Sequence, residues 1–185
     1  VEVTSCGLND EPLKAEGEYP SIIACNITNG HMPHGSNSIY TFSFPNVTNI
    51  GEERFIAEVE NKTLIGYKYF KFSGTKNISV TIRKETENNK VKLEAPKRID
   101  ERCDAEVKRC ASFKDNAKIA EESYIDILNE EKGKSIGRIS IPDNLEDKWC
   151  RISGNVNFPD GVYPLYFVYH VKNSIQIKSF DFIGG

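Results

Sequence analysis

Apolar and polar residues alternate one by one in several stretches of this 185-residue chain. In 77–83, the apolar residues Ile78, Val80 and Ile82 are separated by polar ones, and 150–158 shows the same period. A period of two is typical of a β-strand with one buried face and one solvated face. The pattern therefore predicts a chain built from antiparallel sheets, each with one face in a common core.

Turn signals divide the chain into about ten strand candidates. Turns are expected at Asn61-Lys62, at Gly74 and at Asp160-Gly161. The apolar parity jumps between Ile177 and Phe180, which predicts a bulge in the last strand. The expected strands are 40–44, 55–59, 65–72, 78–82, 90–93, 124–128, 135–141, 150–158, 162–170 and 175–182. This number of short strands predicts an all-β fold, an antiparallel β-sandwich forming a single domain over residues 1–185.

One segment, at about 96–122, departs from the strand pattern. It is rich in charge, and Ile99, Cys103, Val107 and Cys110 fall at helical spacing, which predicts a small helical insertion. In a helix, Cys103 and Cys110 would lie about 10 Å apart along the axis, too far for a disulfide. In an irregular loop, a disulfide between them would be a local staple. The pairing of the five cysteines stays open.

Charge and motifs exclude several classes of function. The formal net charge is −3, whereas a general nucleic-acid binder shows a basic excess. No apolar run reaches the roughly 18 residues of a membrane span, and no basic amphipathic helix suited to a membrane surface is present in the sequence pattern. The nucleophile-elbow and phosphate-loop motifs are missing from the sequence, which argues against catalysis by this chain alone.

The chain begins at Val1, and we interpret it as a module excised from a larger protein. Four N-x-S/T sequons favour an extracellular or cell-surface location. They begin at Asn26, Asn46, Asn61 and Asn77.

Trp149, the only tryptophan, lies off the predicted core face. The core parity belongs to Cys150 and Ile152, and Trp149 shares its parity with polar residues just after the polar loop 142–148. An aromatic ring on a polar face beside a loop is how sugar-stacking sites are built, because the ring meets the C–H face of a sugar. The alternatives are that Trp149 packs under its own loop or that it lies on the inner face of the second sheet.

The second half of the chain resembles carbohydrate-binding module family 6. The residues that carry the likeness are 149–156 (WCRISGNV), 160–168 (DGVYPLYFV) and 174–180 (SIQIKSF). The runs 55–59 (FIAEV) and 65–70 (IGYKYF) extend it, so that it covers roughly residues 12–183 without an insertion at about 85–122. The chain is similar to the modules that follow catalytic domains of glycoside hydrolase family 43.

The resemblance implies a non-catalytic jelly-roll sandwich that binds a polysaccharide or oligosaccharide and accompanies a catalytic domain. In that family two aromatic rings and an amide hold the sugar. Trp149 matches the family's tryptophan, Phe55 stands near the partner ring, and the amide falls at Gln176 or Asn173. Some members also bind on a sheet face, where Tyr166 and His170 are expected.

The resemblance also implies a structural Ca²⁺ near the N-terminal strand. Glu16 matches one ligand of the family's early acidic pair, whereas Lys14 replaces the other. Lys178 stands where the family has an aspartate. Calcium prefers several oxygen ligands, so these replacements weaken the site.

Three functions follow from these observations. The first is a carbohydrate-binding module for a xylan-like plant polysaccharide, and it predicts an exposed Trp149 with an aromatic partner. The second is a structural accessory domain that packs against a catalytic domain without binding sugar, and it predicts a buried Trp149. The third is a glycosidase fragment, and it predicts two carboxylates about 5 to 9 Å apart in a cleft.

Overall fold

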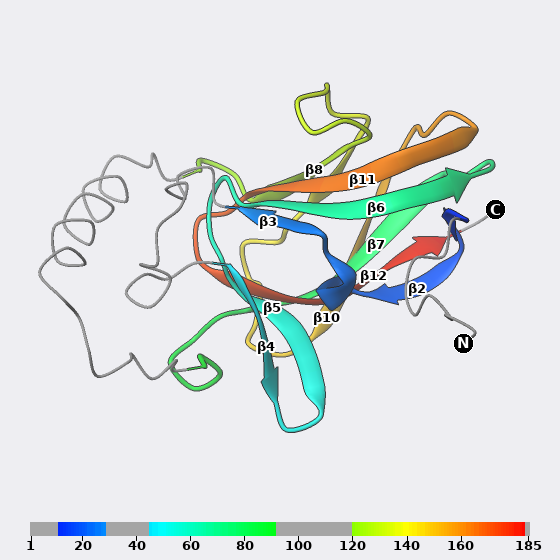
Figure 1. The fold of residues 1–185 in the computed structure, drawn as a ribbon. Coiled ribbons are helices and arrows are strands. Elements are labelled where there is room, and N and C mark those ends of the chain that lie inside the picture. Colours follow the sequence, from blue (N-terminus) through cyan, green and yellow to red (C-terminus); the bar gives the residue numbers. More distant parts are fainter. Residues whose placement is uncertain (1–10, 29–44, 92–119, 184–185) are drawn as a thin grey trace, which may run out of the picture.

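The computed structural model describes residues 11–28, 45–91 and 120–183, which form two facing β-sheets (Figure 1). The first sheet, sheet A, has the strand order β1-β6-β11-β8-β9, and β3 also pairs with β6. These strands are β1 (Leu13–Lys14), β3 (Asn26–Thr28), β6 (Leu64–Phe72), β8 (Tyr124–Leu128), β9 (Gly137–Ser140) and β11 (Gly161–His170).

The second sheet, sheet B, has the order β10-β7-β12-β5-β4, and β2 also pairs with β12. Its strands are β2 (Gly17–Pro20), β4 (Asn46–Ile50), β5 (Glu53–Val59), β7 (Asn77–Lys84), β10 (Cys150–Asn155) and β12 (Ile175–Ile183). A 3₁₀ turn, η1 (Ser21–Ile23), follows β2. Every pairing is antiparallel except the two-residue pairing of β1 with β6. The predicted antiparallel β-sandwich is confirmed.

Aromatic side chains fill the space between the sheets. Phe70 of sheet A and Phe180 and Phe182 of sheet B pack within 6 Å of one another. Phe72 stacks flat on Phe158, with ring centroids 3.7 Å apart. Truncating a fully buried phenylalanine to alanine costs about 3 to 5 kcal/mol, so each of these rings contributes strongly to the stability of the sandwich.

The edges of the two sheets come together between β9 and β10, and two glycines allow the approach. A Cβ atom on Gly137 would lie 2.6 Å from the carbonyl oxygen of Asn155. A Cβ atom on Gly154 would overlap the carbonyl oxygen of Arg138. Because backbone atoms cannot move aside as a side-chain tip can, both positions require glycine.

The chain turns at Asn61-Lys62 and at Gly74 as expected, with Lys62 and Gly74 both at a φ of 68°. At Asp160-Gly161 the chain bends at Asp160, and Gly161 already begins β11. The bulge expected between Ile177 and Phe180 is also confirmed, because the pairing of β12 with β7 shifts register between Ile177 and Ser179. The strand expected at 90–93 is wrong for its described part, since Lys90 and Val91 lie outside any strand. The polar turn at 86–89, closed by the Asn89 side chain, ends the ladder before them.

Two predictions lie wholly or almost wholly outside the described residues. The strand expected at 40–44 is one, and the helical insertion at about 96–122 is the other, of which only 120–122 are described. Within the described residues, Cys25 and Cys150 are free thiols. Burial raises the pKa of the Cys150 thiol. No helix of the described part is long and apolar enough to cross a membrane.

Candidate functional site

Trp149 lies directly before β10, on the face of sheet B that points away from the core. Ile82 and Ile177 belong to the core cluster, so their neighbours Arg83 and Gln176 lie on the opposite face of the sheet. Arg83 and Gln176 stand opposite each other in the pairing of β7 with β12. Trp149 packs against this outer surface and is half-buried.

Four side chains fix the indole ring. Its Nε1 donates a hydrogen bond to Glu53 Oε2 at 3.1 Å. The Phe55 ring meets it edge-on, with centroids 5.6 Å apart at 66°. The Arg83 guanidinium carbon lies 4.1 Å from the ring centroid, and Lys178 Nζ lies 5.6 Å from it. The ring is thus preorganised, with a cation stacked on it.

A buried amide holds that cation in place. Gln176 has no exposed surface, and its Oε1 accepts a hydrogen bond from Arg83 Nε at 2.6 Å. Its Nε2 donates to Glu85 Oε1 at 3.1 Å and to the carbonyl oxygen of Asn89 at 2.9 Å. Glu85 in turn accepts a bond from Ser174 Oγ at 2.6 Å. The side-chain amide of Gln176 is therefore hydrogen-bonded within the protein, and it orients Arg83 over Trp149.

Two of the charged side chains around the ring, Lys178 and Glu53, pair with each other. Lys178 Nζ lies 2.7 Å from Glu53 Oε1. Hydrogen bonds from Lys178 and then from Trp149 hold the pKa of Glu53 below its usual value. Burial lowers the pKa of Arg83, against the opposing attraction of Glu53, Asp147 and Glu85. One guanidinium nitrogen, Arg83 Nη2, is buried without a hydrogen-bond partner among the described residues.

Phe55 is near Trp149, as expected, but its side chain has no exposed surface. It therefore supports the indole from beneath its edge and offers no open ring face in this conformation. Arg83 also lies over the Phe55 ring, 5.1 Å from its centroid.

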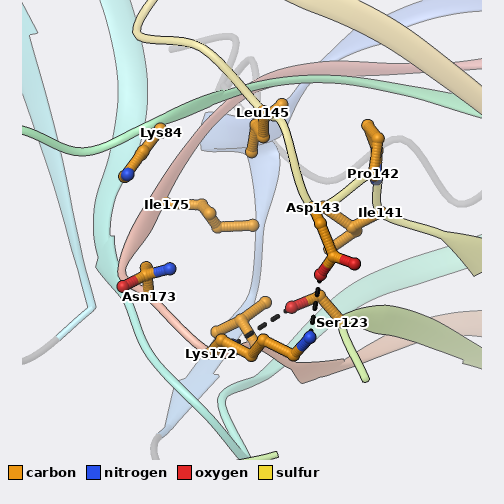
Figure 2. Close-up of a pocket in the computed structure, with 10 residues that line it drawn as sticks. Lys84, Ser123, Ile141, Pro142, Asp143, Leu145, Lys172, Asn173 and Ile175 are labelled. Atoms are coloured by element: carbon orange, nitrogen blue, oxygen red, sulfur yellow. Dashed lines mark hydrogen bonds and ion pairs between the residues drawn. The ribbon is translucent and has the colours of Figure 1, made fainter. Parts of the chain in front are cut away.

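Asn173, the other amide candidate, lines a separate small cavity of about 40 Å³ in which Trp149 takes no part. Figure 2 shows Asn173 and Lys84 on one side of this cavity and Asp143 on the other. Lys172 closes the cavity: its Nζ lies 2.8 Å from Asp143 Oδ1, and its backbone N–H donates a hydrogen bond to Ser123 Oγ. The cavity has room for one or a few waters and is too small for a sugar ring.

Tyr166 and His170 lie on the other sheet. Their strand neighbours Leu165, Phe167 and Tyr169 are in the core, so both point to the outer face of sheet A. Tyr166 packs on Gly66, where an added Cβ atom would lie 2.6 Å from the Tyr166 ring.

His170 stacks on Tyr124 with ring centroids 4.4 Å apart, and its Nε2 lies 3.4 Å from Asp126 Oδ2. Burial lowers the pKa of His170, against the attraction of Asp126. The outer face of sheet A therefore presents its own aromatic patch, on a different sheet from Trp149.

The residues that the resemblance assigns to calcium do not assemble into a calcium site. Glu16 is exposed and pairs with Lys14 at 3.3 Å, so an ammonium already neutralises its carboxylate. Lys178 is paired with Glu53. Among the described residues, no group of three or more carboxylates, histidines or cysteines could hold a metal ion. Calcium binding stays a prediction from the resemblance, which these side chains do not fit.

Sequence reasoning missed Arg83 and Glu53. The alternation in 77–83 places Arg83 on the solvated face, so the pattern contained part of the signal. It contained no sign that Trp149, 66 positions further along the chain, would cover the guanidinium. That contact depends on the register of β7 between β10 and β12, which no local pattern gives.

No protein-family model matches the chain. A curated protein of Thermoclostridium stercorarium described as "Xylosidase/arabinosidase" is 28% identical over 193 aligned residues, covering 97% of this chain. The chain spans 32% of the length of that relative.

Solved structures are similar in fold. A family 6 carbohydrate-binding module of Clostridium stercorarium, in complex with cellobiose, has a TM-score of 0.59 at 12% identity and covers 96% of this chain and 100% of its own. The chain has the fold of the family 6 carbohydrate-binding modules. A module of Clostridium cellulolyticum, in complex with xylose, gives 0.59 at 12% identity, with 92% of this chain and 99% of that one covered.

The same fold occurs within a larger enzyme. A glycoside hydrolase family 43 arabinoxylan arabinofuranohydrolase of Bacillus subtilis, in complex with cellotetraose, matches with a TM-score of 0.55 at 11% identity. The match covers 98% of this chain and 30% of the enzyme. In that protein the fold is therefore one part of a longer glycoside hydrolase chain.

Proposed function

We propose that this chain is a non-catalytic module that binds a xylan-like polysaccharide through Trp149 and serves a glycoside hydrolase. The observation that carries the proposal is the half-buried, rigidly held indole on the outer face of a sheet with the family 6 module fold. A ring fixed before binding loses little conformational entropy when a sugar stacks on it. The fold and the xylosidase/arabinosidase relative support the proposal.

The four residues expected at the site take different roles in this proposal. Trp149 is the stacking platform, and Phe55 supports its edge. Gln176 acts by positioning Arg83, whose guanidinium lies over the ring in place of a direct amide contact. Asn173 stays a candidate for a peripheral contact at the loop end of the sheet.

The wider context follows from the same likeness. The partner within the parent protein is a glycoside hydrolase catalytic domain, as in the Bacillus subtilis enzyme. A polysaccharide substrate too large to enter a cell places the protein outside the cell or at its surface. Glu53, which accepts the indole hydrogen bond, is tied to Lys178, and Glu85 is tied to Ser174 and Gln176, which favours a structural role for both carboxylates.

The test is a pull-down on insoluble xylan, arabinan, cellulose and β-1,3-glucan with the wild type and Trp149→Ala. One stacked ring contributes roughly 1 to 3 kcal/mol, so Trp149→Ala should weaken binding about 5- to 150-fold. Its melting temperature should stay within a few degrees of the wild type, since Trp149 lies outside the core cluster. Tyr69→Ala, which removes a 59% exposed ring from β6, is the matched control and should bind normally.

Two results would overturn the proposal. A wild type that binds no polysaccharide on the panel would favour the accessory domain that only packs against a catalytic domain. Retained binding by Trp149→Ala would show that the sugar does not depend on the Trp149 platform.

A further inference from the structure

Two strands share one edge of β12 and leave a gap between them. β5 pairs with β12 as far as Ile177, and β2 pairs with it from Ser179 onward. The pairing of β12 with β7 passes from Ile177 to Ser179, so Lys178 is the extra residue of the bulge. In Figure 1, β2 (blue) lies beside β12 (red), and the β4–β5 hairpin (cyan) extends away from the sandwich.

Side-chain hydrogen bonds stabilise the two sides of this gap. The pairing of β5 with β12 ends at Ile177, and the Ile177 carbonyl accepts a hydrogen bond from Ser21 Oγ of η1 at 2.6 Å. Ser21 has no exposed surface. On the far side, Ser179 Oγ donates to Glu18 Oε1 at 2.5 Å. Ser21 thus satisfies the backbone carbonyl at which the pairing of β5 with β12 ends, and the bond between Ser179 and Glu18 ties β12 to β2 beyond it.

This split opens into a groove of about 510 Å³, which we call the β2–β5 groove. Its walls are Glu18, Pro20 and Ile22 on one side and Glu52, Glu53 and Arg54 on the other. Lys178 and Ser179 form its floor. The groove is open toward solvent, so a ligand bound in it would keep part of its surface exposed.

The lining defines the ligand chemistry. Carboxylates accept from hydroxyl groups, and lysine and arginine donate to hydroxyl or ring oxygens. Three carboxylates against two bases leave the groove with a net negative charge, which disfavours an anionic sugar. Pro20 and Ile22 offer an apolar wall for the C–H face of a ring. A neutral, hydroxyl-rich sugar unit fits all three features.

The groove is joined to the Trp149 platform by two shared residues. Glu53 accepts the indole hydrogen bond and also lines the groove. Lys178 lies over the indole and also forms the groove floor. We propose that the β2–β5 groove is a second subsite for a neutral sugar unit of the same chain that stacks on Trp149. This inference rests on the proposed function and adds that the module reads several consecutive units.

The first test compares xylose, xylobiose and xylotetraose by calorimetry. In the wild type, affinity should rise at least tenfold from xylose to xylotetraose. The double variant Glu52→Ala/Arg54→Ala changes groove residues for which no contact with Trp149 is seen, and it should lose most of that gain. Lys68→Ala/Lys71→Ala, on exposed positions of sheet A, should keep it. A double variant whose affinity rises with chain length as in the wild type would overturn the inference.

The second test is ¹⁵N NMR titration of the wild type with xylotetraose, which separates the two proposals. Shifts at the Trp149 indole and at the amides of Ile22, Arg54 and Ser179 would support both. Shifts at Trp149 alone would overturn the groove and leave the proposed function standing. Shifts in the groove alone would uphold a sugar site there and overturn the Trp149 platform, and no shifts at all would overturn both.

Discussion

Replacing Gln176 by leucine tests whether this amide belongs to the protein's interior or to the ligand. The side chain has no exposed surface and makes three hydrogen bonds, to Arg83, Glu85 and Asn89. Leucine has a similar volume and none of these groups, so the change removes the bonds with little change in packing.

The expected cost follows from what the substitution leaves behind. A buried polar group without its partner costs about 1 to 3 kcal/mol, and more where a charge is involved. Arg83 and Glu85 are only half-buried and can be rehydrated in part, which reduces the penalty. We expect Gln176→Leu to lower the free energy of unfolding by about 2 to 4 kcal/mol. In a domain of this size that is a fall of roughly 4 to 16 °C in melting temperature.

The assay is urea unfolding followed by far-ultraviolet circular dichroism, with sugar binding measured on the folded protein. Asn173→Leu is the matched control, because Asn173 is exposed, and its stability should stay within about 0.5 kcal/mol of the wild type. A Gln176→Leu protein with wild-type stability and no sugar binding would refute the reasoning, since Gln176 would then be a direct ligand group.

Three further predictions follow from individual contacts. Glu53 has a lowered pKa, so its ionised form stabilises the folded state above the ordinary glutamate pKa of 4.5, and this stabilisation is lost as the pH falls through the lowered pKa. Trp149 fluorescence should change in that acid range, and Glu53→Gln should remove the transition. Addition of EDTA or Ca²⁺ should leave the melting temperature unchanged, because the Glu16 carboxylate is paired with Lys14 and the described residues form no calcium-binding group. A clear rise with Ca²⁺ would show a site that the described residues do not reveal. Gly154→Ala should destabilise the domain by about 2 kcal/mol or more in urea unfolding, because the added Cβ atom meets the Arg138 carbonyl, whereas Asn155→Ala at the exposed neighbour should be nearly neutral.

The local pattern was sufficient to predict most strands. Alternation located β7 and β10, and the parity jump after Ile177 located the bulge that now forms the groove floor. These features depend on near neighbours in sequence, which is why a single chain reveals them. Of the strand expected at 90–93, the described residues Lys90 and Val91 lie outside any strand, because the polar turn at 86–89 ends the ladder before them.

The site was predictable in part. The parity of Trp149 placed it correctly on the outer face, and the resemblance placed Phe55 beside it. The sequence did not reveal that Arg83 would stack on the ring or that Gln176 would be buried, because both depend on the order of β10, β7 and β12 in the sheet. Asn173 and Gln176 are three residues apart in the chain, yet one lines a loop-end cavity and the other lies on the Trp149 surface.

The central claim is that sugar stacks on Trp149, and the chain's single tryptophan makes this directly measurable. Intrinsic fluorescence should be followed while xylotetraose is added to the full chain, with calorimetry on the same samples to establish saturation. The account predicts a saturable change in the emission of Trp149 with the same dissociation constant as the calorimetric titration. An emission spectrum that stays unchanged while calorimetry reaches saturation would contradict it, because the sugar would then bind away from the indole.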